Sequence, residues 1–336
     1  MGSGKTTSFD IAHRAGVSQA TVSRALRNSP LVNPDTCKRI KKIAREMNYR
    51  VDRSAAGLRS QQSRTIALLL FEDPTTDDSQ INPFFLNMLG NITREAARRD
   101  YDVLVSFQQL SDDWLHEYQV SNRADGIILL GYGDYGRISE RLRKLHEEGA
   151  HFAIWGATLP ELEGHGIGSE NATGGAMAAR HLLDIGRRNI AFLGGATDDC
   201  PEFKQRYRGV CEALAAAKLP VHENMQFEAE NQETSGFDAA KRLLLSGVEF
   251  DAIVAASDLI AIGAMKYLRK SGLDVPADVS VVGFDDIPAA SYFSPSLTTI
   301  KQDTKLAAAA LVGNLLNMIE GKAVRSLLLP MTLVVR

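Results

Sequence analysis

The side chains best suited to recognition chemistry in this 336-residue chain lie near its N-terminus, on one face of a predicted helix. That face carries Gln19, Ala20, Ser23 and Arg24. The guanidinium of Arg24 can donate two hydrogen bonds to guanine O6 and N7, and the amide of Gln19 can pair with adenine or contact a phosphate. Ala20 offers only a methyl group, which suits thymine. The spacing therefore favours recognition of DNA bases in a major groove.

Two short helical patterns position this face, and they meet at a turn formed by residues 16–18. The first begins after Thr7, a suitable N-cap, and has Asp10 in its first turn, where a negative charge suits the helix dipole. Gly16 permits a sharp bend, and Ser18 then caps the second helix. The residues expected to face inward are Ile11, Ala12, Ala15, Val17, Val22, Ala25 and Leu26. This arrangement predicts a helix-turn-helix.

Residues that could support catalysis lack the neighbours that an enzyme needs. The segment Gly2–Thr6 imitates the end of a phosphate-binding loop, but no strand precedes it and the earlier glycine of that pattern is missing. Asp198, Asp199 and Cys200 fall in a predicted loop, and the seven histidines are scattered without metal-ligand spacing. We therefore expect no enzymatic activity, no metal site and no cofactor.

Charge divides the chain into a basic head and an acidic body. Residues 1–64 hold 13 Lys or Arg against 4 Asp or Glu, whereas residues 65–336 hold 25 against 37, so the net charges are +9 and −12. A basic head suits a polyanion, because neutralising phosphates releases counterions. An acidic body would keep the rest of the molecule off the duplex.

The cysteines and the apolar runs indicate the compartment. Cys37, Cys200 and Cys211 form no disulfide framework, which suits a reducing environment. The first 30 residues are polar and basic, and no run approaches the ~20 apolar residues needed to span a bilayer. We expect a soluble, cytoplasmic protein with no membrane partner.

The basic head continues into a third helix and a short linker. Asn33, Pro34 and Asp35 are typical of a helix start, and the lysines and arginines that follow are expected to form a solvated polar side. The small-residue segment 52–60 contains one large apolar side chain, Leu58, which could insert into a minor groove.

Beyond residue 64 the pattern changes to alternating strands and helices. Apolar, strand-like runs occur at residues 65–71, 102–107, 126–132, 151–155, 189–194, 252–257 and 279–284. Helical patterns occur between and after them, at about residues 84–99, 136–148, 173–186, 202–217, 234–247 and 258–271. Strands that are apolar on both faces and alternate with helices indicate parallel, doubly wound sheets. We expect two α/β lobes, because there are too many units for one sheet, with ligands at the carboxyl ends of the strands.

Several motifs match a known family in the right order. In the head these are Asp10-Ile11-Ala12, Gly16-Val17-Ser18, Thr21-Val22-Ser23-Arg24, Asn48-Tyr49 and Ala55-x-x-Leu58. Further along they are Ile167–Gly175, His181-Leu182 with Gly186–Leu193, Arg206–Gly209, Asp278–Asp286 and Tyr292–Asp303. Together they resemble the lactose-repressor (LacI/GalR) family of bacterial transcription factors, over nearly the whole chain.

The resemblance implies an all-α helix-turn-helix head on a two-lobed core like that of periplasmic binding proteins. The expected divisions are a head at residues 1–50, a hinge helix or linker at 51–63, an N-lobe at 64–168 and 297–325, and a C-lobe at 169–296 and 326–336. The chain would then cross between lobes near residues 169, 296 and 326. Residues 327–336 are expected to form the closing strand of the C-lobe, with no tetramerising coil after it.

The resemblance also implies roles for individual residues in DNA binding. Gln19, Ala20 and Arg24 fall where the family reads bases, and Leu58 matches its intercalating hinge leucine. The remaining positions implied to contact DNA are Thr7, Ser18, Ser23, Thr36, Tyr49 and Ala55. Val51 and Asp52 depart from the hinge pattern, where many relatives carry proline and a neutral polar residue.

An effector site between the lobes is implied at Phe84, Trp155, Arg206, Asn231, Ser257 and Asp285. Arg206 and Asp285 match the family's cleft arginine and aspartate, and such a pair suits vicinal hydroxyls, although it could instead be a structural salt bridge. Trp155 could stack on a sugar face or belong to the core. Asn231 stands where some relatives carry an aromatic residue, which favours a polar ligand over a flat purine.

The implied function is that of a sequence-specific transcriptional regulator, a repressor of carbohydrate-utilisation genes. A homodimer would bind a pseudo-palindromic, double-stranded operator, and a mono- or disaccharide between the lobes would control its affinity. The sequence does not decide between inducer and corepressor, although induction is commoner in the family. The alternatives are a sugar-binding protein with an incidental basic head, and a purine- or nucleoside-responsive regulator.

Overall fold

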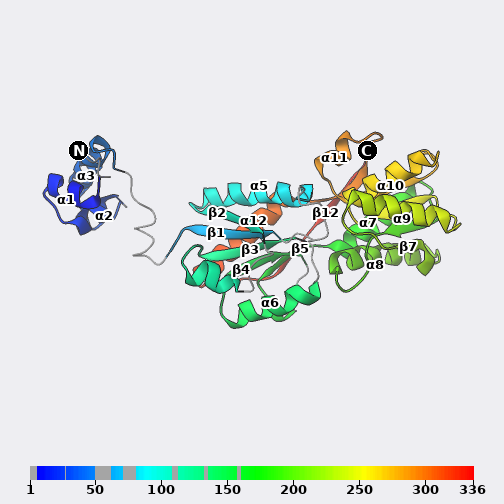
Figure 1. Cartoon of the computed structure of the whole chain (residues 1–336), viewed down its shortest axis with the longest axis horizontal. Helices are drawn as coiled ribbons and strands as arrows, with labels where there is room; N and C mark the ends of the chain where they lie inside the picture. Colours follow the sequence, from blue (N-terminus) through cyan, green and yellow to red (C-terminus); the bar gives the residue numbers. More distant parts are fainter. Residues whose placement is uncertain are drawn as a thin grey trace. The chain divides into compact units, whose positions relative to one another are not determined.

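The computed structural model describes residues 6–26, 28–49, 62–70, 81–107, 113–131, 135–156 and 160–336. The chain forms two compact units, Met1–Ser63 and Arg64–Arg336 (Figure 1). The predicted hinge residues Ala55 and Leu58 lie outside the described residues. Within the described part of the chain, no helix is long and apolar enough to cross a membrane.

Three helices form the head, and their starts and ends follow local chemistry. Helix α1 (Ser8–Ala15) begins at a capping box, in which the Thr7 side chain accepts from the Asp10 backbone and the Asp10 carboxylate accepts from the Thr7 backbone. Gly16, with φ of 63°, ends α1 in the left-handed region. The Ser18 hydroxyl accepts from the Thr21 amide at 3.2 Å at the start of α2 (Gln19–Leu26). The predicted helix-turn-helix is confirmed.

The third helix, α3 (Pro34–Glu46), covers the first two. The Asn33 side chain caps it, with proline at its first position, as the sequence predicted. Ile40 and Ala44 of α3 pack into one apolar cluster with the inward residues of α1 and α2. This small core fixes the angle between α1 and α2 and so sets the direction in which α2 presents its outer face.

The first sheet of the larger unit is entirely parallel, in the order β11-β5-β4-β3-β1-β2. Its strands are β1 (Thr65–Leu70), β2 (Asp102–Phe107), β3 (Gly126–Leu130), β4 (Phe152–Trp155), β5 (Gly166–Ser169) and β11 (Leu327–Leu329). Ile66, Leu68 and Leu70 pack on one side with the apolar residues of α5 (Pro83–Arg98) and α12 (Thr304–Ile319). Ala67 and Leu69 face the other side. Because successive side chains of a strand point to opposite faces, both faces of β1 are buried.

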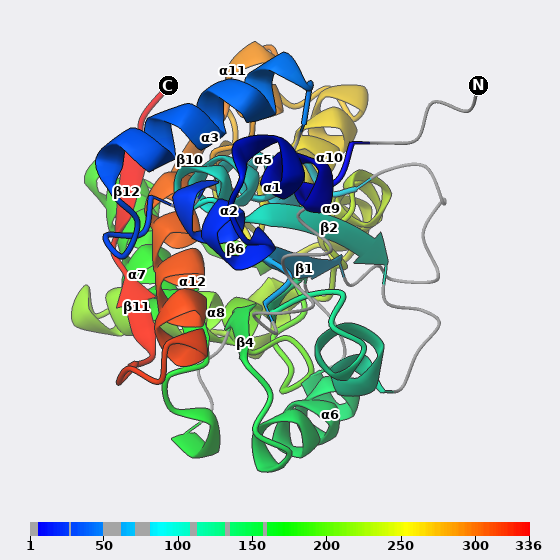
Figure 2. The ribbon, with the colours of Figure 1, turned by 90° about the vertical axis from the view of Figure 1, so that its left-hand side faces the viewer.

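The second side of this sheet is covered by α6 (Tyr135–Glu147) and by a π-helix, η1 (Leu115–Val120). Leu142 and Leu145 of α6 join Trp114 and Tyr118 in this smaller cluster. Figures 1 and 2 show α6 on the opposite side of the strands from α5. A one-turn 3-10 helix, η2 (Pro160–Leu162), precedes β5.

The second sheet has the order β12-β10-β9-β8-β6-β7. Its strands are β6 (Ile190–Leu193), β7 (Gln226–Phe227), β8 (Ala252–Ala255), β9 (Ser280–Asp285), β10 (Thr298–Gln302) and β12 (Met331–Val334). All pairs are parallel except β10 with β12, which is antiparallel. The fold class is therefore confirmed, with one antiparallel edge strand that the sequence did not predict.

Helices cover the second sheet in two packed pairs, α7 (Asn171–Asp184) with α8 (Pro201–Ala216) and α9 (Glu233–Leu245) with α10 (Asp258–Lys270). Short helices η3 (Glu223–Met225) and α11 (Pro288–Tyr292) complete the unit. A Cβ added to Gly175 of α7 would lie 1.9 Å from the Arg206 carbonyl oxygen of α8. Glycine at this position therefore lets the two backbones touch.

Two of the three expected crossings between lobes are wrong. We expected the chain to return to the N-lobe near residue 296, but β10 pairs with β9, so the crossing follows Gln302. We expected residues 327–336 to form one C-lobe strand, but Leu327–Leu329 pairs with β5 of the first sheet. Pro330, which lacks a backbone donor, separates it from β12 of the second sheet.

Candidate functional site

The predicted recognition face is present on α2. Ala20 and Arg24 are exposed, Gln19 and Ser23 are half-buried, and Val22 and Ala25 are fully buried on the opposite side. Because the buried side is fixed by the head core, the exposed side is presented as a rigid surface. Arg24 is therefore held on the exposed side of α2, opposite the buried Val22 and Ala25.

The head carries a contact that the sequence did not predict. The Gln19 amide nitrogen donates to the Ser8 hydroxyl at 3.0 Å, which links the start of α2 to the start of α1. This bond uses one of the two hydrogens of the Gln19 amide nitrogen. Ser18 was predicted to contact a phosphate. Its hydroxyl caps α2 and also lies 2.9 Å from the Thr21 hydroxyl.

The remaining predicted DNA contacts differ in burial. Thr7 is exposed, and its hydroxyl donates to the Asp10 carboxylate at 2.7 Å. The same side chain caps α1. Thr36, near the start of α3, is half-buried. Tyr49 packs against the head core, and its amide donates to the Ala44 carbonyl at 2.9 Å. The exposed basic residues of α3 are Lys38, Arg39, Lys42 and Arg45.

A second group of predicted residues meets at the carboxyl ends of the strands of the second sheet. Arg206 of α8 is fully buried. Its Nε donates to the Asn171 side-chain oxygen at 2.9 Å, and its Nη1 donates to the Ala256 carbonyl oxygen. The guanidinium carbon lies 4.6 Å from the centre of the Phe284 ring and 5.3 Å from that of Phe203. Cation-π contact and hydrogen bonds together hold this charge away from water.

Asp285, at the end of β9, is the countercharge of Arg206. Its Oδ1 lies 3.9 Å from Arg206 Nη1 and accepts from the Gln302 amide at 2.6 Å. Burial raises the pKa of Asp285 to about 6, although Arg206 and the Gln302 bond act in the opposite direction. The backbone φ of Asp285 is 107°, which is strained for a residue with a side chain. Strain, burial and a shifted pKa are typical of a binding site.

Ser257 and its neighbour Asp258 hold this end of the sheet together. The buried Ser257 hydroxyl accepts from the Ile260 amide at 3.2 Å and so caps α10. The Asp258 carboxyl accepts from the Thr299 hydroxyl at 2.5 Å and from the Ile287 amide at 2.8 Å. Burial, and then the nearby Asp285, raise the pKa of Asp258 well above its usual value.

Asn231 precedes α9 and has an unusual environment. Both its amide nitrogen and its amide oxygen are buried, and no hydrogen bond to either is formed within the described residues. A buried amide that lacks partners is costly, so this side chain is suited to a bound polar molecule.

The aromatic residues predicted for the N-lobe side meet one another. Phe84, in the first turn of α5, and Trp155, at the end of β4, have ring centres 6.0 Å apart. They are 1% and 3% exposed, so neither presents an open face. This packing is that of a core tryptophan, the alternative that the sequence left open.

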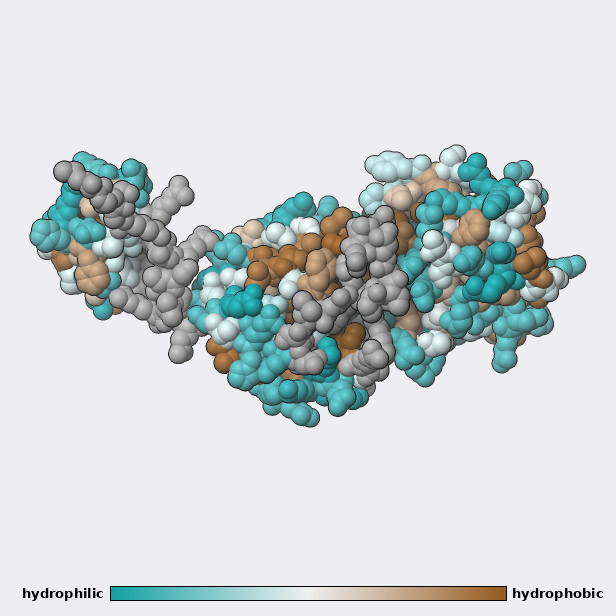
Figure 3. All heavy atoms as spheres, viewed as in Figure 1, coloured by the Kyte–Doolittle hydropathy of each residue, from teal (hydrophilic) through white to brown (hydrophobic). Residues whose placement is uncertain are grey.

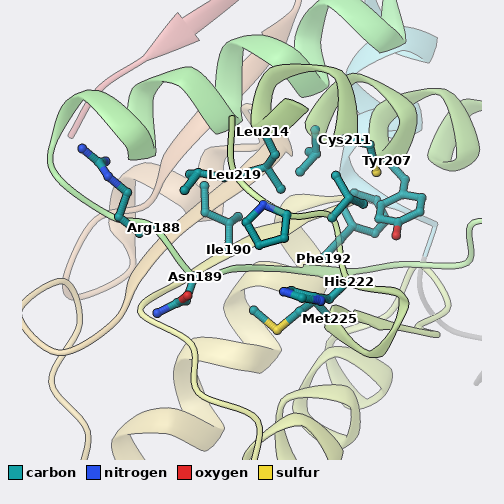
Figure 4. A pocket seen from close by; sticks show the side chains of 13 residues that line it. Arg188, Asn189, Ile190, Phe192, Tyr207, Cys211, Leu214, Leu219, His222 and Met225 are labelled. Carbon is teal, nitrogen blue, oxygen red and sulfur yellow. The ribbon is translucent and has the colours of Figure 1, made fainter. Parts of the chain in front are cut away.

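A separate cavity of about 70 Å³ lies beneath α8. Figure 4 shows Tyr207, Cys211 and Leu214 of α8 above Ile190, with His222 and Met225 on the far side. None of the predicted effector residues lines it.

Two residues of the buried polar group were not predicted. Asn171 orients Arg206, and its own amide nitrogen donates to the Ser169 carbonyl at 3.1 Å. Gln302 orients Asp285. Both lie in segments that match family motifs, which was the available signal, but neither was given a role.

Comparison with known proteins gives consistent matches to both units. Residues 9–52 match the bacterial regulatory proteins of the lacI family, and residues 179–336 match the periplasmic binding protein-like domain. The chain is 30% identical over 316 residues to the HTH-type transcriptional regulator CelR of Thermobifida fusca, covering 93% of this chain and 91% of the relative.

Two solved structures match nearly the whole length of the chain. The Lac repressor dimer bound to operator and the anti-inducer ONPF has a TM-score of 0.82 at 27% identity, covering 99% of this chain and 98% of that chain. A transcriptional regulator CelR-cellobiose complex has a TM-score of 0.73 at 28% identity, covering 98% and 99%.

Proposed function

The chain belongs to the lacI family of bacterial regulatory proteins, and we propose that it represses carbohydrate-utilisation genes by holding an operator until a sugar binds. It is a DNA-binding transcriptional regulator and not an enzyme, as its relatives are. The observation that carries the proposal is the rigid outer face of α2, with Arg24 exposed on a head whose residues 1–64 have a net charge of +9.

In the proposed complex, α2 enters the major groove and Arg24 pairs with a guanine. Residues at the helix ends and on α3 contact phosphates and set the register. Ala55 and Leu58 act in the hinge, where Leu58 opens a central base step.

A homodimer would place two heads on the half-sites of a pseudo-palindrome. Exposed apolar side chains on α5 and β2 support it, since Leu86, Val105 and Phe107 are 53%, 42% and 45% exposed. Figure 3 shows hydrophobic side chains gathered over this part of the surface. Exposed apolar side chains on two elements that contact each other suit a protein interface.

The effector would bind at Arg206, Asp285 and Asn231. The CelR structure carries cellobiose, and a sugar is the ligand class that a buried arginine, carboxylate and amide suit best. The ligand would change the relation of the two lobes, and with it the spacing of the hinges in the dimer. An inducing sugar separates the hinges and releases the DNA.

The DNA-binding part of the proposal is tested by fluorescence anisotropy with upstream DNA containing a palindrome, against the same DNA scrambled. Arg24→Ala should weaken palindrome binding by about 5- to 150-fold, the loss expected for one bidentate base contact. Arg98→Ala is the matched control, because Arg98 has a side chain 70% exposed on α5 of the larger unit. Equal affinity for palindromic and scrambled DNA would contradict the proposal.

A further inference from the structure

The cavity beneath α8 lies at the opposite end of the second sheet from the buried polar group of Arg206 and Asp285. Its lining includes Arg188, Asn189 and Ile190, which lead into and begin β6. Asp285 ends β9, and β6, β8 and β9 run parallel to one another. The cavity therefore lies toward the amino ends of these strands, and it is not part of the proposed effector site.

Apolar side chains form the floor of this pocket. Four of them are at most 6% exposed, and they come from β6 and from one face of α8: Ile190, Phe192, Val210 and Leu214. Leu219 and Met225, from the chain after α8, are half-buried, whereas the rim residue His222 is exposed. Figure 4 shows the α8 side chains on one side of the pocket and His222 with Met225 on the other. A bound molecule would meet apolar carbon inside and water at the mouth.

The two polar side chains of the α8 wall satisfy each other. The Tyr207 hydroxyl donates a hydrogen bond to the Cys211 sulfur, one turn further along α8. The Tyr207 ring also packs on Phe192, with ring centres 5.1 Å apart. Burial raises the pKa of Tyr207 to about 12, so its hydroxyl stays protonated at neutral pH. An apolar group can therefore fill the space without leaving a polar atom of this wall unpaired.

The charged groups near the pocket disfavour a charged ligand. Glu212 and Glu223 lie close enough to Cys211 and Tyr207 to raise their pKa values, in addition to the larger effect of burial, and these carboxylates would repel an anion. Arg188 could attract an anion, but Figure 4 shows its side chain pointing away from the other labelled groups, and its Nη1 donates to two backbone carbonyls at 2.8 Å. A cation would lose its hydration against the apolar floor. An uncharged ligand is therefore favoured.

The volume of the pocket limits the size of its occupant. At about 70 Å³, the pocket has roughly half the volume of an apolar cavity of ~150 Å³ that accommodates benzene in another protein. A branched chain of about four carbons fits such a space better than an aromatic ring does. Water is a poor occupant, because a buried water needs several polar partners and the floor offers carbon.

We propose that this pocket is a second ligand site of the protein, which takes a small, uncharged, branched aliphatic alcohol. The carbon chain fills the space over Ile190 and Phe192, and the hydroxyl remains at the mouth beside His222. Filling the space adds contacts between α8 and β6, so the ligand stabilises the folded state by mass action. This site goes beyond the proposed control by a sugar and does not depend on it.

The first test follows the reactivity of Cys211 in the full-length protein. Modification by iodoacetamide is quantified for each cysteine peptide, and Cys37 of the head is the internal control. The probe is 2-methyl-1-propanol, whose Kd is measured by ligand-observed NMR, and 2-methylpropanoate is its charged match with the same carbon skeleton. At ten times its Kd, the alcohol should slow the modification of Cys211 by about tenfold and leave that of Cys37 unchanged. Absence of binding or of slowing would overturn the site, and equal slowing by the acid would overturn its preference for an uncharged ligand.

The second test changes the volume of the pocket in both directions at one residue. Leu219→Phe fills the space and should abolish binding of the alcohol, whereas Leu219→Ala enlarges it and should admit benzyl alcohol, which the parent protein excludes. Leu245→Phe is the matched control, because Leu245 is 72% exposed at the end of α9. Because the two Leu219 variants act in opposite directions, one of them remains informative if the other does not fold. Normal alcohol binding by Leu219→Phe, or equal binding of benzyl alcohol by the parent and Leu219→Ala, would contradict the assignment.

A third variant separates this site from the proposed effector site. A thermal-shift panel of glucose, galactose, ribose and cellobiose first identifies the sugar that raises the Tm most. Asp285→Ala should lose the response to that sugar and bind 2-methyl-1-propanol with the Kd of the parent protein. Loss of alcohol binding in Asp285→Ala would place the alcohol in the effector site and overturn the inference. Normal operator binding together with no binding of the alcohol would also overturn it, while leaving the proposed function intact.

Discussion

Replacing Gly175 by alanine should separate α7 from α8 and so disturb the site that Arg206 occupies. The added Cβ would lie 1.9 Å from the Arg206 carbonyl oxygen, whereas real Cβ contacts essentially never fall under 3.0 Å. The two helices must therefore move apart by about 1.1 Å, the difference between these distances. No flexible side chain can yield instead, because the atoms met belong to the α8 backbone.

The magnitude follows from two opposing terms. Overpacking in a close-packed interior costs about 1–3 kcal/mol, and a backbone clash belongs at the upper end of that range. Alanine gains about 1 kcal/mol over glycine in a helix. The free energy of unfolding should therefore fall by about 2 kcal/mol, which lowers the urea midpoint by ~0.7 M if m is ~3 kcal/mol per M.

Urea unfolding followed by circular dichroism measures this change, and Gly313→Ala is the matched control. Gly313 lies in α12, and a Cβ there would meet nothing within 4 Å, so that variant should gain stability. Calorimetry should also show weaker effector binding in Gly175→Ala, because the Asn171 bond to Arg206 joins the two helices. Equal midpoints and equal affinities for the two variants would refute the reasoning.

Four further tests concern the hinge and the buried carboxylate. Leu58→Gly should weaken operator binding in an anisotropy titration while leaving ligand binding intact, and unchanged operator affinity would contradict the hinge role. The pKa of Asp285 is about 6 in the folded state, against a usual value of 3.8, so the folded state binds this proton more tightly than the unfolded state does. The free energy of unfolding should therefore fall as pH rises from 3.8 to about 6. Asp285→Asn should flatten this part of the curve of stability against pH. Ligand hydroxyls donate to the ionised carboxylate, so calorimetric effector affinity should decline below pH ~6, and a pH-independent Kd would exclude Asp285 as the acceptor. Asp285→Ala should abolish the effect of the sugar on operator binding without abolishing operator binding itself, and a normal response would remove Asp285 from the site.

The sequence predicted the regular parts of the fold because their signals are local. The strands near residues 65–71 and 252–257 are continuous apolar runs, and they were found within two residues of their observed ends. Thr7, Gly16 and Asn33 act through side chains or backbone angles of their own segments, so their caps were also predicted.

The parts that were missed depend on tertiary context. The strand β10 has the sequence Thr-Thr-Ile-Lys-Gln, which is too polar to appear as a buried run, and the glycines of β5 weaken its pattern. Helix α12 contains the run Ala307–Ala310 and is apolar over much of its surface, which blurs a helical period. The lobe crossings were misplaced because strand membership depends on pairing partners far away in the sequence.

The residues of the buried polar site show the same difference between local signals and tertiary contacts. Arg206 and Asp285 were predicted from their motifs and lie together, but Asn171 and Gln302 matter through contacts that spacing alone does not show. Phe84 and Trp155 were both assigned to the effector site and do contact each other. Their burial depends on tertiary packing, which the sequence does not show.

The central claim is that a small molecule controls DNA binding, and one titration tests it directly. The full-length protein is titrated into labelled palindromic DNA at fixed salt, with and without the sugar that gives the largest thermal shift. For an inducing sugar, the account predicts an operator Kd at least tenfold weaker in its presence, with Asp285→Ala unresponsive. An operator Kd that the bound sugar leaves unchanged would contradict it.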